Sequence, residues 1–299
     1  MGILLEKLKK GKVLSCDGAW GTLLQARGLK AGECPELWNI LHREEVLDIA
    51  RSYVEAGSDL IETNSFGGNR FKLHHFGLEG RVHELNRAAA EISKEAVNGR
   101  GLVLGSVGPT GILLMTGDVN PGELYEAFAE QAEALAQGGA DAILVETMSD
   151  LEEARLAVRA AKARTGLEVI CTMTFDKNAD GQFRTIMGLA PGEMVSVLRE
   201  AGADILGSNC GNGTHAMIDI LKEIRRVDPE VPVLIQGNAG MPEYREGGTI
   251  FPEKPEDTVR YIPELVKFGA NIIGGCCGTT PQHIALISKE ISRIEGEAS

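Results

Sequence analysis

The stretch Ile272-Ile273-Gly274-Gly275-Cys276-Cys277-Gly278-Thr279-Thr280-Pro281 indicates a buried β-strand that ends at two adjacent cysteines, turns on glycine and enters a helix. A second stretch, Asp204-Ile205-Leu206-Gly207-Ser208-Asn209-Cys210-Gly211-Asn212-Gly213, has the same form and reaches a cysteine at the same point. Neighbouring thiols at a strand end are poorly placed to form a disulfide with each other, but they suit one shared soft cation. The two stretches therefore predict a repeated strand-to-helix unit and a candidate metal site.

The same unit recurs along the chain, because eight apolar runs are each followed by apolar residues at helical spacing. Continuous apolar runs are typical of parallel strands covered on both faces, and eight such units at this length favour a (β/α)8 TIM barrel. We predict an α/β protein with a single domain over residues 1–299; a doubly wound open sheet is the alternative. The expected strands are 13–16, 59–64, 102–107, 142–147, 168–175, 204–208, 231–236 and 271–275, and the main expected helices are 43–56, 78–97, 121–137, 150–163, 191–201, 214–226, 256–268 and 281–294.

Composition narrows the classes of function. The chain has 299 residues and a formal net charge of -13, which disfavours binding to nucleic acid or to anionic membranes. Its apolar runs are shorter than the roughly 20 residues that span a bilayer, and residues 1–12 lack the pattern of a signal peptide, so we expect a cytoplasmic protein. Six cysteines in a chain this long do not form a disulfide framework. The composition indicates no particular oligomeric state.

Active sites of such barrels form at the carboxyl ends of the strands, and the polar residues there are the candidates. Because one strand separates the strand that ends near Cys210 from the strand that ends at Cys276 and Cys277, the three sulfurs can meet. Three thiolates and one open position are typical of a catalytic zinc site. The alternative is that these cysteines are buried and inert, which we expect of the remaining three, Cys16, Cys34 and Cys171.

Several motifs resemble those of the zinc-dependent homocysteine S-methyltransferase family, and most closely the homocysteine-binding barrel of cobalamin-dependent methionine synthase. They are Asp17-Gly18-Ala19-Trp20-Gly21-Thr22, Glu62-Thr63-Asn64-Ser65-Phe66-Gly67, Gly108-Pro109-Thr110-Gly111, Asn209-Cys210-Gly211, Asn238-Ala239-Gly240 and Gly274-Gly275-Cys276-Cys277-Gly278-Thr279. The resemblance covers essentially the whole chain. It implies a (β/α)8 barrel in which Cys210, Cys276 and Cys277 bind Zn²⁺.

The resemblance also implies how homocysteine is held. Asp17 and Glu146 match the residues that bind the amino group, while N–H groups of the Gly18, Ala19 and Thr63 loops could bind the carboxylate. Asn238 and Thr110 are weaker candidate contacts. On the residues alone, Asp17 could be a turn aspartate and Glu146 a rim charge paired with a lysine. His215 and His283 are expected in the first turns of helices and are not candidate ligands.

The implied reaction is transfer of a methyl group to homocysteine, whose thiol loses its proton at zinc. Since the sequence ends at Ser299 without a corrinoid-binding module, we expect the donor to be a methyl-corrinoid (methylcobalamin) on a separate partner protein. The alternative donors are S-methylmethionine and betaine, which would need an aromatic cage. Aromatic residues make up only 5% of the chain, and Trp20, Trp38 and Phe66 are those expected near the rim.

Three other interpretations remain open. One is a redox or metal-sensing module that uses Cys276 and Cys277 and has no amino-acid pocket. Another makes Cys276 a covalent nucleophile beside a phosphate held by residues 274–279. The third keeps the methyl transfer but changes the acceptor to a different aminothiol, because Trp20 and the loop at 176–188 depart from the family pattern.

Overall fold

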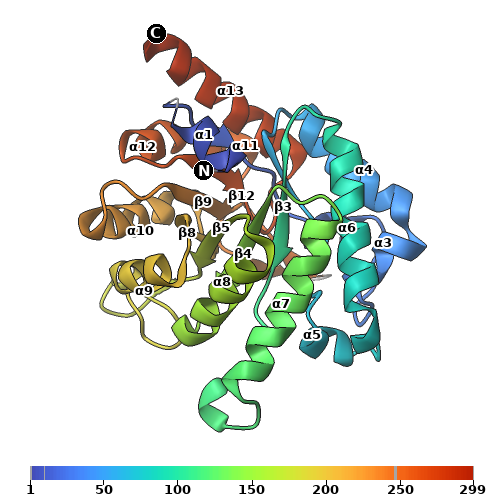
Figure 1. The fold of residues 1–299 in the computed structure, drawn as a ribbon. Helices are drawn as coiled ribbons and strands as arrows, with labels where there is room; N and C mark the ends of the chain where they lie inside the picture. The colour runs from blue at the N-terminus through green and yellow to red at the C-terminus, as the bar shows by residue number, and fades with distance from the viewer. Residues whose placement is uncertain (1, 10, 246–247, 299) are drawn as a thin grey trace.

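In the computed structural model, which describes residues 2–9, 11–245 and 248–298, eight parallel strands form one sheet (Figure 1). The order of neighbours is β1-β12-β9-β8-β5-β4-β3-β2, so each strand pairs with the next barrel strand of the chain and the last pairs with the first. The expected domain, 1–299, begins and ends on residues outside the described ones. The strands are β1 (Leu14–Ser15), β2 (Leu60–Glu62), β3 (Leu102–Val107), β4 (Ala142–Met148), β5 (Glu168–Met173), β8 (Ile205–Gly213), β9 (Val233–Asn238) and β12 (Ile272–Gly275).

Contacts between β1 and β2 close the sheet into a barrel. Cys16 forms an isolated parallel bridge with Leu60, the N–H of Asp17 donates to Leu60 O at 3.1 Å, and the N–H of Asp59 donates to Ser15 O at 2.9 Å. A doubly wound sheet would leave both edges open. The structure therefore confirms the predicted single-domain (β/α)8 barrel. Cys16 lies just past the two-residue β1 rather than inside a longer strand.

Helices surround the sheet in Figure 1 and have the expected start and stop signals. Asp150 caps α8, where its side chain accepts the N–H groups of Glu152 and Glu153, and Pro121 opens α7. The larger helices are α4 (Arg43–Glu55), α6 (Val82–Val97), α7 (Pro121–Gln137), α8 (Leu151–Thr165), α9 (Met194–Ala201), α10 (Thr214–Val227) and α13 (Pro281–Ala298), and short ones are α2 (Gly21–Ala26), α3 (Trp38–Leu41) and α5 (Arg70–His74).

Two helix predictions were wrong in detail. The helix expected over 256–268 is divided into α11 (Pro255–Val259) and α12 (Ile262–Lys267), since Pro263 has no N–H to continue the hydrogen-bond ladder. Thr214 does not cap α10 but is its first residue, and the cap is Gly213. The helices expected from 78 and 191 begin with short 3-10 turns, Glu79–Arg81 and Pro191–Glu193.

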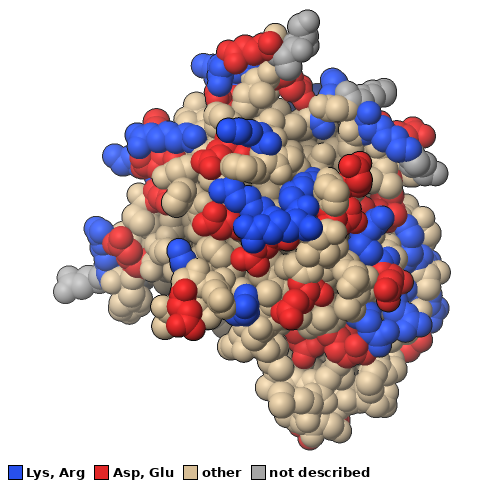
Figure 2. All heavy atoms as spheres, turned by 90° about the vertical axis from the view of Figure 1, so that its left-hand side faces the viewer, with Lys and Arg blue, Asp and Glu red and all other residues tan. Residues whose placement is uncertain are grey.

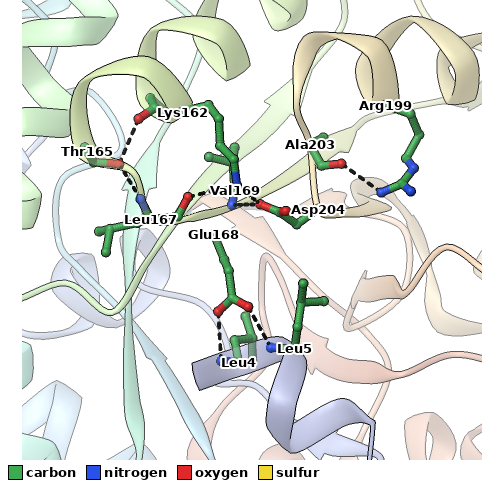
Figure 3. Close-up of polar contacts among 11 residues, drawn as sticks. Leu4, Leu5, Lys162, Thr165, Leu167, Glu168, Val169, Arg199, Ala203 and Asp204 are labelled. Atoms are coloured by element: carbon green, nitrogen blue, oxygen red, sulfur yellow. Dashed lines mark hydrogen bonds and ion pairs between the residues drawn. The ribbon is translucent and has the colours of Figure 1, made fainter. Parts of the chain in front are cut away.

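The amino-terminal end of the barrel is covered by α1 (Ile3–Leu8), a helix that the strand–helix pattern did not predict. Leu4 and Leu8 are buried in a cluster with barrel-interior residues such as Leu60 and Leu104. Figure 3 shows Glu168, at the start of β5, accepting the N–H groups of Leu4 and Leu5 at 2.8 and 2.9 Å. Glu168 thus satisfies two N–H groups that the start of a helix leaves without an intrahelical partner.

Two small antiparallel ribbons lie in loops at the carboxyl ends of the strands. The loop at 176–188 contains β6 (Asp176–Lys177) paired with β7 (Phe183–Arg184), so it does form a unit of its own. The loop after β9 contains β10 (Glu243–Arg245) and β11 (Gly248–Ile250). Neither ribbon was predicted from the sequence.

Charged side chains of both signs cover the helical face shown in Figure 2. Many pair within one turn of a helix, as Arg155 and Glu152 or Arg293 and Glu290 do. Exposed pairs of this kind contribute little to stability, so their main effect is solubility. The lowest part of the molecule in Figures 1 and 2, near the start of α7, shows few charged side chains. None of the described helices combines the length and apolarity needed to cross a membrane.

Candidate active site

Three cysteines from two strand ends meet at the mouth of the barrel. Cys210 lies within β8, while Cys276 and Cys277 follow β12, and β9 lies between these two strands. The three sulfur atoms lie within 4.8 Å of one another, and the sulfurs of Cys210 and Cys277 are 3.9 Å apart. Tetrahedral zinc with Zn–S bonds of about 2.3 Å requires sulfurs about 3.8 Å apart. The donor set therefore fits zinc in both chemistry and spacing.

The backbone is arranged locally to bring these side chains together. Cys210 has φ of +60°, a left-handed conformation that is unusual for a residue other than glycine, and the register of β8 against β9 shifts between Asn209 and Gly213. On the other side, the N–H of Cys276 donates to Gly237 O at 2.8 Å, and Cys277 O accepts the N–H of Ala239 at 3.0 Å. The end of β9 thus holds the Cys-Cys turn in place.

The three thiols strongly affect one another's pKa values. Hydrogen bonds from the Cys276 and Cys277 thiols lower the pKa of Cys210 to about 3. The contact with Cys210 raises the pKa of Cys277 to about 12 and raises the pKa of Cys276 well above its ordinary value. Three thiolates this close together would therefore need a bound cation, since like charges disfavour each other's ionisation.

A cavity of about 260 Å³ opens beside the sulfurs, a volume suited to a small metabolite. Of the predicted site residues, Gly18, Ala19, Thr63 and Glu146 line it together with the three cysteines. The other lining residues come from the segments that follow β1 and β2 and from strands β2, β3, β4, β9 and β12: Trp20, Gly21, Thr22, Leu24, Pro35, Glu36, Glu62, Asn64, Ser65, Phe66, Ser106, Thr147, Gln236 and Gly275.

Asp17 lies beneath the cavity and is fully buried rather than exposed to it. Its Oδ2 accepts the indole N–H of Trp20 and the N–H of Glu62, both at 2.9 Å. Desolvation raises the pKa of Asp17 to about 7. Trp20 therefore lines the cavity and also engages Asp17, one of the predicted ammonium ligands.

Glu146 points into the cavity from the end of β4. It accepts a short hydrogen bond from the Ser106 hydroxyl and one from the amide of Asn209 at 3.2 Å. Burial raises the pKa of Glu146 to about 7. No lysine or arginine pairs with it among the described residues, so it is not a rim charge neutralised by a lysine.

Glu62 is a third buried carboxyl group at this cavity, and sequence reasoning missed it as a site residue. It lies at the end of β2, where Gln236 Nε2 donates to it at 2.6 Å. Desolvation, followed by the charges of Glu146 and Asp17, raises its pKa well above the ordinary value. Its place directly before Thr63 at a strand end was the signal that could have identified it. Three carboxyl groups around one cavity favour a ligand with a positive charge.

Asn238 does not line the cavity but lies behind Cys210. It is 3% exposed, and its side chain hydrogen-bonds Cys210, an interaction that favours the thiolate. His215 and His283 lie in the first turns of α10 and α13, as predicted. Thr110 donates to Glu153 instead of facing the cavity.

The three cysteines expected to be inert are all buried. Cys16 lies with Asp17 and Glu62 in a second group whose ligand atoms are within 4.8 Å of one another. Burial raises the pKa of Cys16 well above its ordinary value. Cys34 donates to Glu36 at 3.2 Å, and Cys171 lies inside β5.

The sequence profile of homocysteine S-methyltransferases matches residues 14–291. The chain belongs to the homocysteine S-methyltransferase family. Curated relatives include the methionine synthases of Mycobacterium tuberculosis, 32% identical over 98% of this chain, and of Mycobacterium leprae, 31% identical over 97%. The chain spans 26% and 25% of the lengths of these two relatives, about a quarter in each case.

Solved structures share the barrel. The homocysteine methyltransferase MmuM from Escherichia coli, in its metallated form, superposes with a TM-score of 0.79 at 24% identity, covering 96% of this chain and 99% of that one. A methyltransferase from Methanosarcina mazei gives a TM-score of 0.62 at 12% identity, covering 98% of both chains. At these identities the likeness establishes the fold, while membership of the homocysteine S-methyltransferase family rests on the sequence profile.

Proposed function

We propose that this chain methylates the thiol of homocysteine to give methionine, with Cys210, Cys276 and Cys277 holding Zn²⁺. The observation that carries the proposal is the convergence of three sulfurs on a cavity whose other walls contain buried carboxyl groups. An aminothiol has a thiol that can bind at the cysteine site and an ammonium that can bind the carboxyl groups. The redox-module interpretation predicts no such amino-acid cavity.

Zinc bound to the three thiolates would lower the pKa of a substrate thiol from about 8.5, so that the sulfur is ionised at neutral pH. The protein then has to hold this sulfur at a fixed place and orientation. Cys210 and Cys277 lie on one side of the cavity, and the hydrogen bonds from Asn238 and from the β9 end keep them there.

We assign the ammonium of homocysteine to Glu146, supported by Glu62 and by the deeper Asp17. Burial raises the pKa values of all three groups, and neighbouring negative charges add to this for Glu62 and Glu146; a bound ammonium would favour the ionised carboxylates. Asp17 would act from beneath the cavity floor, through the charge that it places there. In this arrangement the substrate is held at both ends, with its sulfur toward the cysteines.

The carboxylate of homocysteine would bind at the turn after β1. Of the predicted donors, the N–H of Ala19 already donates to Thr279 Oγ1 at 3.1 Å and the N–H of Thr63 to Leu104 O at 3.1 Å. Gly18 is therefore the strongest of the three candidates, and Ala19 and Thr63 would contribute mainly by shaping the wall.

In the methyl transfer, the homocysteine sulfur forms a bond with the methyl carbon. The bond between this carbon and the donor breaks, and its electron pair stays with the donor. The thiol proton has left for solvent before this step. Homocysteine binding should thus release a proton near pH 7.

For the donor, we propose a methyl-corrinoid carried by a protein module. Exposed apolar side chains occur on the loops at the barrel mouth, and they suit contact with another protein surface. They include Phe66, Leu113, Met115, Ile186, Met187, Met241 and Tyr244. By contrast, Trp20 and Phe66 are the aromatic residues among the cavity lining, and Trp38 is buried against His42. Two aromatic rings make a poor cage for betaine or S-methylmethionine.

The test combines metal analysis with methyl-transfer assays. Wild-type protein should contain close to one zinc, and Cys276→Ser should lose most of it, whereas Cys34→Ser should keep it. Homocysteine methylation with methylcobalamin, S-methylmethionine and betaine should be highest with methylcobalamin and should follow zinc content. Activity that survives complete zinc removal would instead favour Cys276 as a covalent nucleophile.

A further inference from the structure

Two strained residues flank the substrate cavity. Thr147 has φ of +58° and Cys210 has φ of +60°, and each follows directly on a polar residue of the site, Glu146 and Asn209. The left-handed conformation is unfavourable for residues with a β-carbon, and it persists only where surrounding contacts enforce it. Among the described residues the one other such case is Asn98, which ends α6 as a helix cap.

Asn209 directly precedes one strained residue, Cys210, and its side chain hydrogen-bonds the other, Thr147. Its Oδ1 accepts the N–H of Thr147 at 2.9 Å, and its Nδ2 donates to Thr147 Oγ1 at 2.7 Å. The same Nδ2 lies 3.2 Å from Glu146 Oε2 and 3.8 Å from the sulfur of Cys276. Asn209 is fully buried, so these bonds are not in exchange with solvent.

The position of Asn209 in the sheet explains why it can connect these groups. It lies on β8, and in the sheet order β8-β5-β4 its side chain crosses β5, where Thr172 Oγ1 donates to Oδ1 at 2.7 Å, to reach β4. The register of β4 against β5 shifts between Val145 and Met148, as that of β8 against β9 does after Asn209. Asn209 thus joins two irregular strand ends across the strand between them.

We propose that Asn209 is a positioning residue that fixes the distance between the carboxylate of Glu146 and the sulfur ligands, and so selects the chain length of the aminothiol. The inference rests on the proposed function, in which one end of the substrate binds Glu146 and the other binds beside the cysteines. Homocysteine and cysteine differ by one methylene, for which pockets discriminate by about 10- to 200-fold. A fixed distance makes the shorter aminothiol unable to reach both ends.

The test compares binding of homocysteine and cysteine by calorimetry, together with zinc content, in wild type, Asn209→Ala and Asn209→Ala/Thr147→Gly. Asn209→Ala should keep its zinc, and its preference for homocysteine over cysteine should fall by about tenfold or more. Thr147→Gly in that background should restore part of the preference, because glycine adopts positive φ without strain. Asn86→Ala, which removes another buried asparagine with hydrogen bonds to Gly68 and Val82, should keep the full preference.

If Asn209→Ala does not fold, Thr147→Val tests the same idea, since it removes the hydroxyl that Asn209 binds and disfavours the left-handed conformation. An unchanged preference in the variant that folds would overturn the proposal. A loss of zinc in Asn209→Ala would also overturn it, because Asn209 would then support the metal ligands and not the distance to Glu146. If wild-type protein binds no homocysteine, the proposed function itself is overturned. This result is distinct from an unchanged preference or a loss of zinc in the variants.

Discussion

Glu146, Glu62 and Asp17 are carboxyl groups that the fold buries around one cavity, and burial raises the pKa of each. Such groups resist ionisation until a cation arrives. The arrangement therefore lowers the stability of the empty protein at neutral pH and favours the ammonium-bearing ligand. Strained or destabilised groups of this kind concentrate at functional sites.

The first prediction concerns Glu146→Gln in zinc-free, reduced protein. The pKa of Glu146 is raised from 4.5 to about 7 in the folded state, so the stabilisation by the protonated carboxyl is complete below about pH 4.5 and is lost as the pH rises through 7. At about 1.4 kcal/mol per pKa unit, the variant should gain about 1 kcal/mol or less over wild type at pH 5 and up to about 3 kcal/mol at pH 8. Urea unfolding at both pH values measures this.

The control is Glu200→Gln, at an exposed position. It should change the free energy of unfolding by the same amount at both pH values. Parallel stability profiles of wild type and Glu146→Gln between pH 5 and pH 8 would contradict the interpretation of Glu146 as a carboxyl group destabilised by burial.

The sequence was sufficient to predict the cysteine ligands but not every residue around them. Cys210, Cys276 and Cys277 stand at ends of apolar runs, and parallel strands bring such ends to one rim. Glu62 and Asn209 also stand at strand ends, but their roles depend on which neighbour each side chain reaches across the barrel, and strand spacing carries no such information. The left-handed conformations of Thr147 and Cys210 have no residue-type signal either.

At the scale of elements, the candidate site lies at one end of the barrel and the packing of α1 closes the other end. The carboxyl ends of the strands hold the cavity, while α1 closes the opposite end with Leu4 and Leu8. The alternation of apolar runs and helices predicted the barrel because each unit is local in sequence. It did not predict α1, the divided α11 and α12, or the two ribbons, since these depend on contacts made by segments outside the repeating units.

The second prediction compares Leu4→Ala with Ile3→Ala on α1. Leu4 is fully buried and Ile3 is 51% exposed. A buried Leu→Ala change costs about 2–5 kcal/mol, so Leu4→Ala should lower the free energy of unfolding by about this amount, while Ile3→Ala should change it by about 0.5 kcal/mol or less. Zinc content and homocysteine affinity should stay at wild-type values in both. Loss of zinc in Leu4→Ala at a temperature where it is folded would show that the two ends of the barrel are coupled.

At the scale of the whole molecule, the formal net charge is -13, the helical face in Figure 2 carries charged side chains of both signs, and exposed apolar residues occur at the mouth. The chain spans about a quarter of the length of each methionine synthase relative. Under the proposed function, apolar contact around the mouth would hold the donor over the cavity and exclude water from the transferring methyl group.

The third prediction separates docking from chemistry. Ile186→Asp places a charge on the mouth loop, and Val227→Asp places one on an exposed apolar residue at the far end of α10. With a corrinoid-binding protein charged with methylcobalamin, Ile186→Asp should raise KM for that protein about tenfold and leave the rate with free methylcobalamin unchanged. Val227→Asp should affect neither reaction. If Ile186→Asp lowers the methyl-transfer rate equally with the corrinoid protein and with free methylcobalamin, Ile186 shapes the cavity and is not part of a docking surface.

The most direct test of the central claim is X-ray absorption at the zinc edge, with and without homocysteine. The protein should show three sulfur neighbours at about 2.3 Å before homocysteine is added and four afterwards. Fewer than three sulfur neighbours in the free protein, or an unchanged spectrum at saturating homocysteine, would contradict the assignment of Cys210, Cys276 and Cys277 as ligands of a zinc ion that receives the substrate thiol.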